Sequence, residues 1–105
     1  MASFYNVNEK ALPDAETIFF TSASDATVVL SILCANTSAS AADITVNQLD
    51  ASNATLSALA STITIPNDAS LELLGNNYIL PSGRKLAGLT NVSGSIDVSI
   101  SYVEI

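Results

Sequence analysis

The stretch from Ser95 to Ile105, SIDVSISYVEI, constrains the fold of this chain most strongly. In it, β-branched and aromatic side chains alternate with polar ones at every second position. Such alternation places the two kinds on opposite faces of an extended chain, so it predicts a β-strand with one buried face. We expect the rest of the chain to supply partners for this strand. Its apolar face comprises Ile96, Val98, Ile100 and Tyr102.

Further short segments upstream carry strand signals, and turn residues separate them at intervals of about 8–12 residues. Residues 27–35, TVVLSILCA, are apolar at successive positions, which predicts a central strand covered on both faces. Residues 54–65 could begin with a helical turn, but their context favours a strand. The expected strands before the last one are residues 17–21, 27–35, 42–49, 54–65, 70–74, 78–80 and 84–89.

This pattern of about eight short strands without a crossover helix predicts an all-β fold. We expect an antiparallel β-sandwich of the jelly-roll or Greek-key type, with an up-and-down barrel as the alternative. A chain of 105 residues suits a single domain. We expect residues 17–105 to form it and residues 1–16, which are weakly periodic, to form an N-terminal arm. The aromatic pair Phe4 and Tyr5 on this arm would either cover the domain's own sheet or dock on another subunit.

The charge balance argues against two classes of partner. Three Lys and Arg residues stand against ten Asp and Glu residues, which gives a net charge of −7. Nucleic acids and anionic membranes attract clustered basic residues, so we expect neither as a partner. The first residues, MASFYNVNEK, lack a basic stretch followed by an apolar run, so we expect no signal peptide and synthesis in a cytoplasm.

The residue types needed for catalysis and metal binding are sparse. The chain has no His, the commonest general base and zinc ligand. Its acids are scattered singly, although Glu72 and Asp97 could still converge as a pair of the kind that hydrolyses glycosides. We therefore expect a protein that is not an enzyme and that uses no metal or cofactor. The single cysteine, Cys34, lies in an apolar run, so we expect a buried, unreactive side chain.

Two features are candidates for contact with a partner. Arg84 and Lys85 hold two of the three positive charges directly after a Pro-Ser-Gly turn. They would either form local salt links with the chain's own acids or meet an acidic neighbouring surface. Exposed aromatic side chains could also stack on a sugar, and Tyr5 and Tyr78 are the candidates for such a platform.

Three segments carry a family resemblance: VVLSILCANTSASAADITV, SLELLGNNYILPSGRKLAG and GSIDVSISYVEI. Between residues 26 and 105 the chain resembles small β-sandwich structural proteins of tailed-phage virions, of the type found in cyanophages. The resemblance implies a non-enzymatic virion protein at the capsid surface, and within that class a capsid decoration or cement protein bound to the major capsid protein lattice. It implies no catalytic residues and no cofactor.

We expect contact with the major capsid protein or other virion proteins through Phe4, Tyr5 and Asn6 of the arm and through Arg84 and Lys85. Homo-oligomers, including trimers, are compatible with exposed edge strands and an apolar arm. The alternative function is a receptor- or glycan-binding module associated with a tail or neck fibre.

Overall fold

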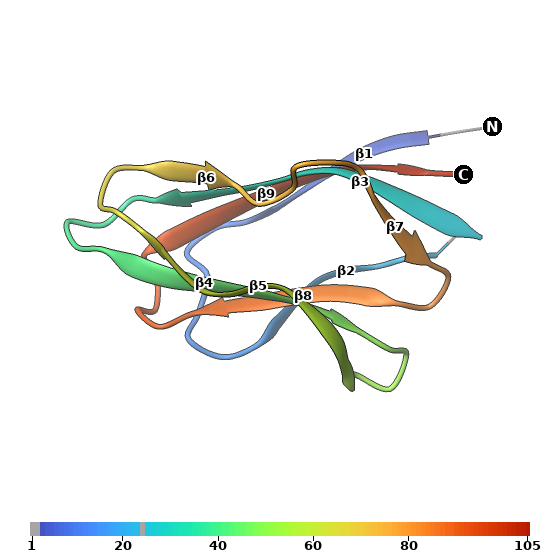
Figure 1. Ribbon diagram of the computed structural model, residues 1–105, viewed down its shortest axis with the longest axis horizontal. Coiled ribbons are helices and arrows are strands. Elements are labelled where there is room, and N and C mark those ends of the chain that lie inside the picture. The colour runs from blue at the N-terminus through green and yellow to red at the C-terminus, as the bar shows by residue number, and fades with distance from the viewer. Residues whose placement is uncertain (1–2, 24) are drawn as a thin grey trace.

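The computed structural model describes residues 3–23 and 25–105, and within them the chain forms nine β-strands and no helix. The strands make two antiparallel sheets that pack face to face, which confirms the predicted all-β sandwich (Figure 1). The molecule is elongated, with principal extents of 42 × 25 × 21 Å. No helix long and apolar enough to cross a membrane occurs in this part of the chain.

The two sheets differ in how regularly they are built. Sheet A has the order β1–β9–β3, and the far edge of β3 pairs with β6 over one part of its length and with β7 over another. Sheet B has the order β2–β8–β4–β5. The strands are β1 (Ser3–Glu9), β2 (Thr17–Thr21), β3 (Ala26–Asn36), β4 (Ala42–Leu49), β5 (Thr55–Ile65), β6 (Ser70–Glu72), β7 (Tyr78–Pro81), β8 (Lys85–Thr90) and β9 (Ile96–Glu104).

Strand β9 has the one buried face that its alternation predicted. It lies between β1 and β3, and Ile96, Val98 and Ile100 are each at most 2% exposed on its inner face. These side chains pack with inward residues of sheet B such as Ile44 and Val46, both fully buried. The shared core is what holds the two sheets together, because it removes apolar surface from water.

Strand β3 is central in its sheet, but it is not covered on both faces as expected. A register shift between Val29 and Ser31 makes Leu30 an extra residue in the ladder with β9. Because of this bulge, Val29 and Ile32 both point into the core although three positions separate them. Leu30 and Leu33 are left 39% and 41% exposed. The successive apolar residues therefore reflect a bulge and a bare outer face rather than a second covering layer.

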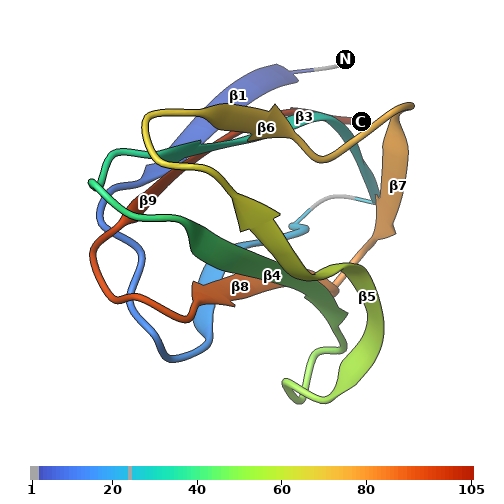
Figure 2. The ribbon, with the colours of Figure 1, turned by 60° about the vertical axis from the view of Figure 1, so that its left-hand side comes forward.

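Residues within the expected arm form an additional strand. β1 pairs with β9 in unbroken register from Ser3–Glu104 to Glu9–Val98. Loop residue Leu12 is fully buried, and the backbone N–H of Leu12 donates to the carbonyl oxygen of Ile96 at 2.8 Å. Strand β1 thus lies at the border of sheet A, with no strand of the described chain beyond it (Figure 2).

A candidate interaction surface

A row of exposed apolar side chains crosses the outer face of sheet A. Four residues on neighbouring strands pair with one another in a series. Phe4 pairs with Val103, Val103 with Val28, and Val28 with Ile79. Directly paired residues of antiparallel strands point to the same face, so the four side chains form one continuous row over β1, β9, β3 and β7. Phe4 is 77% exposed and Ile79 is 58% exposed, while the two valines between them are half-buried. We call these four residues the outer row.

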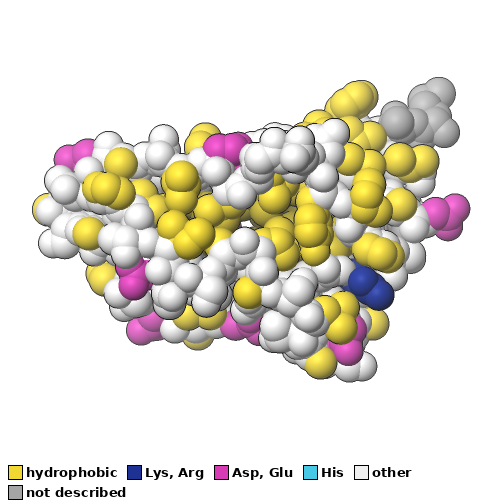
Figure 3. Space-filling view, viewed as in Figure 1, with side chains coloured by type: hydrophobic (Ala, Val, Ile, Leu, Met, Phe, Trp, Pro, Cys, Tyr) yellow, Lys and Arg dark blue, Asp and Glu magenta, His cyan; other side chains and the backbone are white. Residues whose placement is uncertain are grey.

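Other exposed apolar residues lie beside the outer row. Leu30 projects at the bulge of β3, and Ile105 is 63% exposed with its N–H bonded to the carbonyl oxygen of Ala26 at 3.1 Å. Figure 3 shows hydrophobic side chains gathered at the end of the molecule where β1 begins, β9 ends and β7 lies. Contiguous apolar surface of this kind is typical of a contact site, whereas single exposed apolar residues need no explanation.

Among the predicted contact residues, the three of the arm have different roles. Phe4 belongs to the outer row. Tyr5 faces the other way and stacks on Tyr102 with ring centroids 5.4 Å apart, and Tyr102 in turn stacks on Phe20 of β2 at 4.2 Å. The Asn6 amide donates to the Ser101 hydroxyl at 3.2 Å, which ties β1 to β9. Of these three, Phe4 has a side chain free to meet a partner, and Tyr5 is 46% exposed at the rim.

The predicted basic pair lies at the same end of the molecule but in the other layer. The Arg84 carbonyl oxygen accepts the Ser22 N–H at 2.9 Å, and the next residue, Ala23, donates its N–H to Glu104 of β9 at 3.3 Å. Lys85 Nζ donates to Asn53 Oδ1 at 2.6 Å, so its local partner is an amide rather than an acid. The structure therefore places Arg84 and Lys85 near the end of the outer row but on sheet B, and the two groups do not share a face.

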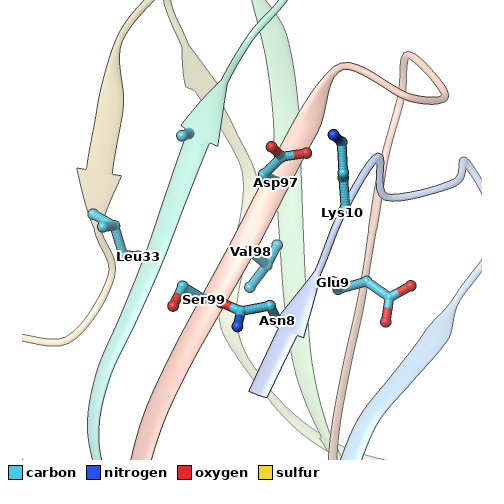
Figure 4. Close-up of a pocket in the computed structure, with 8 residues that line it drawn as sticks. Asn8, Glu9, Lys10, Leu33, Asp97, Val98 and Ser99 are labelled. Carbon is cyan, nitrogen blue, oxygen red and sulfur yellow. The ribbon is translucent and has the colours of Figure 1, made fainter. Parts of the chain in front are cut away.

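A cavity of about 300 Å³ opens on sheet A, at the opposite end from the outer row. Figure 4 shows Lys10, Leu33 and Asp97 among its lining side chains. The Asp97 carboxylate accepts the Ala11 N–H at 2.8 Å and so holds the end of β1. Two carboxylates, those of Glu9 and Asp97, and the Lys10 amine line the cavity, and Figure 4 shows the Glu9 carboxylate pointing away from Asp97 rather than converging on it.

Glu72 and Asp97 do not converge. Glu72 on β6 accepts the Ser31 hydroxyl at 2.6 Å and the Ile32 N–H at 2.8 Å, so its carboxylate is bound on β3. Asp97 belongs to β9, on the other side of β3, and pairs with Ala35. Across residues 3–23 and 25–105, no three His, Cys, Asp or Glu side chains gather where they could hold a metal ion.

Three further side chains are accounted for by the fold. Cys34 is fully buried, as predicted, and burial together with the charge of Glu72 raises the pKa of its thiol to about 12. The Tyr78 hydroxyl donates to the buried Gln48, and the Tyr78 ring packs against the core, so this ring is not an open platform for a sugar. Burial, with smaller contributions from Glu104 and Tyr5, raises the pKa of the Tyr102 hydroxyl above 10.0.

Sequence reasoning missed Val28, Ile79 and Val103 as surface residues. The sequence carries a signal for Val103, because this apolar residue follows Asp97, Ser99 and Ser101 on the polar face of the last strand. Val28 lies in a segment that is apolar at successive positions, a pattern that predicts burial on both faces. Ile79 carried no signal of its own, since a strand as short as β7 shows no clear alternation.

No protein-family model matches the chain, and no curated protein matches its sequence. Solved structures with a similar fold include viral shell proteins. Over 98% of its length the chain resembles a chain of the infectious bursal disease virus VP2 subviral particle, at 13% identity and a TM-score of 0.56. It spans about a third of the length of the infectious bursal disease virus chains that it matches first.

Two other neighbours match the chain more evenly in length. A pentameric capsid protein from metagenomic phage sequences is 15% identical with a TM-score of 0.56, over 97% of this chain and 61% of that one. A pilus protein of Bacillus endospore appendages is 8% identical with a TM-score of 0.60, over 99% of this chain and 86% of that one. At these identities the likenesses establish a shared β-sandwich fold, one that occurs in proteins of assembled shells and fibres.

Proposed function

We propose that this protein is a non-enzymatic structural component of a bacteriophage virion, and specifically a decoration or cement protein that binds the major capsid protein lattice. The observation that carries the proposal is the outer row. A chain with a net charge of −7 leaves four apolar side chains side by side on one sheet face, with no charged residue among them. Such a face favours contact with another protein surface.

Acids of sheet B fit the same orientation on the shell, whereas Glu72 and Asp97 of sheet A lie toward the end away from the outer row. On sheet B, Asp43 bonds to Thr64 at 2.7 Å and Glu16 bonds to Asn47 at 3.1 Å, so both acids lie on the strand surface away from sheet A. With sheet A against the shell, these acids face solvent, where like charge keeps particles from adhering to each other. The likeness to capsid proteins and the segments that resemble virion proteins support a virion role in general.

A decoration protein stabilises a shell because it binds the assembled lattice in preference to free subunits. Its affinity per copy can be modest, since the shell offers many equivalent sites. Phe4 and Ile79, the two most exposed members of the outer row, are the side chains expected to enter pockets of the lattice. Arg84 and Lys85 lie in the other layer, so in this orientation they would not contact the same surface of the lattice as the outer row.

The proposal is tested by counting copies in purified particles of a phage that encodes the chain. We expect quantitative mass spectrometry to give a copy number comparable to that of the major capsid protein, and labelling to place the copies on the capsid. A few copies confined to the tail or neck would contradict the capsid role and favour the fibre-associated receptor- or glycan-binding module instead. Absence from particles would contradict the virion role altogether.

A further inference from the structure

The edges of the two sheets differ in how well they are protected from pairing with another strand. Protected edges are short, bulged, or interrupted by proline or charge. β6 and β7 have three and four residues, and β7 ends at Pro81. β2 has a register shift between Ile18 and Phe20. β5 has three register shifts and a positive φ of 48° at Thr62, and it bends visibly in Figure 2.

Strand β1 has none of these protections within its described length. Its seven residues pair with β9 without a register shift, and they include no proline. Its single charged residue is Glu9, at the end of the strand. The other edge of β1 faces no strand of the described chain, so its outward backbone N–H and C=O groups are available to a further strand.

Asn6 is the middle residue of β1, and the side chains alternate between the two faces on either side of it. Tyr5 and Val7 flank Asn6 on the core side, and Phe4 and Asn8 lie two positions away on the outer side. A second copy of β1, running antiparallel and centred on the same residue, would place Tyr5 opposite Val7 on the core side. It would also place Phe4 opposite Asn8. The apolar and polar faces of the two strands then coincide across the join, as sheet pairing requires.

The charges fit the same register. Glu9 of each copy would lie opposite Ser3 of the other, so the acid of one strand does not meet the acid of its copy. We infer that β1 is a homotypic edge, at which two copies of this chain pair antiparallel about Asn6 and extend sheet A across a twofold axis.

This inference is independent of the proposed virion role, because the edge of β1 and the outer row are different surfaces. A particle protein that is monomeric in solution would contradict the pairing and leave the virion role intact. A dimer that fails to bind particles would contradict the virion role and leave the pairing of β1 intact.

Cross-linking tests the register directly. Residues directly opposite in an antiparallel pair have Cα atoms about 4.5–5.5 Å apart, within the range that a disulfide spans. Asn6→Cys is therefore expected to give a covalent dimer under mild oxidation. Asn8→Cys is the matched control, because its two copies would be four residues apart along the strands, about 14 Å. The native Cys34 is fully buried and does not compete.

We expect the Asn6→Cys protein to run as a dimer on a non-reducing denaturing gel and the Asn8→Cys protein to run as a monomer. Absence of the Asn6→Cys dimer in a folded protein, or equal cross-linking of both variants, would overturn the inference. Far-ultraviolet circular dichroism shows whether each variant is folded.

A charge exchange gives a second test that does not depend on oxidation. Asn6→Lys and Asn6→Asp each place like charges across the twofold axis, so each alone should dissociate about fivefold or more readily than the native dimer. An equimolar mixture of the two should recover the dimer in sedimentation velocity. Ser101→Lys is the control, because it puts the same charge on the neighbouring strand of the same face. A native protein that stays monomeric throughout, or a mixture that does not recover, would contradict β1 pairing.

Discussion

At the scale of single residues, the tightest constraint is at Gly88 of β8. A β-carbon at this position would lie 2.7 Å from the backbone oxygen of Thr45 and 2.8 Å from Cζ of the buried Phe19 ring. The oxygen belongs to the paired strand β4 and cannot move without disturbing the sheet. Glycine here leaves space for the aromatic ring between the two sheets.

Gly88→Ala is therefore expected to lower the free energy of unfolding by about 1–3 kcal/mol, the usual cost of overpacking a core. Gly75→Ala is the control, because a β-carbon there meets nothing within 4 Å. Its effect should be within about 0.5 kcal/mol. Urea denaturation measures both, and equal losses in the two variants would contradict the packing argument.

The carboxylate of Glu72 should make stability depend on pH. Burial pushes the pKa of this group upward, but hydrogen bonds from the Ser31 hydroxyl and the Ile32 and Leu74 N–H groups outweigh burial and hold the pKa below its ordinary value of 4.5. Because the folded-state pKa is the lower one, the stabilisation is present above about pH 4.5 and is lost as pH falls through the folded value.

We expect native protein to exceed Glu72→Gln in unfolding free energy at pH 7, and we expect this advantage to be smaller at pH 3. Ser31→Ala, which removes one of the three donors, should give a smaller pH-dependent difference from native protein. Urea titrations at the two pH values measure these differences. An advantage over Glu72→Gln that is the same at both values would contradict the role assigned to the carboxylate.

At the scale of elements, an aromatic stack links the borders of the two sheets. Tyr5 of β1, Tyr102 of β9 and Phe20 of β2 stack in series, and the second pair is almost parallel at an interplanar angle of 1°. Tyr102 takes part in both contacts and Tyr5 in one.

Replacing the central ring should therefore cost more than replacing the terminal one. We expect Tyr102→Leu to lose about 1–3 kcal/mol and Tyr5→Leu about 0.5–1.5 kcal/mol, since each aromatic pair contributes about 0.5–1.5 kcal/mol beyond its buried area. Thermal and urea unfolding of the two variants and the double variant measure the coupling. A larger loss from Tyr5→Leu would show that the stack does not connect the sheets in this order.

The strands that the sequence predicted well are those in which apolar and polar residues alternate because one face is buried. β4 and β9 alternate regularly, and their inward residues are those expected. β3 was placed correctly, but its bulge was not predicted, because a bulge is set by pairing with β9 rather than by local residues. The outer row was missed for the same reason: Phe4, Val103, Val28 and Ile79 become neighbours through sheet order alone.

At the scale of the whole molecule, the two faces of the sandwich have different characters. The outer face of sheet A carries the outer row at one end and the acids Glu72 and Asp97 toward the other, while Asp43 lies on the outer face of sheet B. The composition predicted a protein that binds other proteins rather than one that catalyses a reaction. It could not say which face makes the contact, since that depends on which strands pair.

The outer row should contribute to binding rather than to folding. We expect the double variant Phe4→Ser/Ile79→Ser to keep its unfolding free energy within about 1 kcal/mol of native protein, because both side chains are already largely exposed. Leu56→Ser/Ile63→Ser on β5 is the matched control, with native side chains 47% and 38% exposed. Chemical denaturation checks both, and a double variant of the outer row that unfolds would contradict a purely external role.

The most direct test is the binding of these two double variants and native protein to phage capsids from which the chain has been removed. Mass spectrometry gives the number of copies bound per major capsid protein. We predict that native protein and the β5 variant fill the capsid, and that the outer-row variant binds about tenfold or more weakly, a loss of about 1.4 kcal/mol or more. Equal binding by all three proteins, or no binding by native protein, would contradict the account.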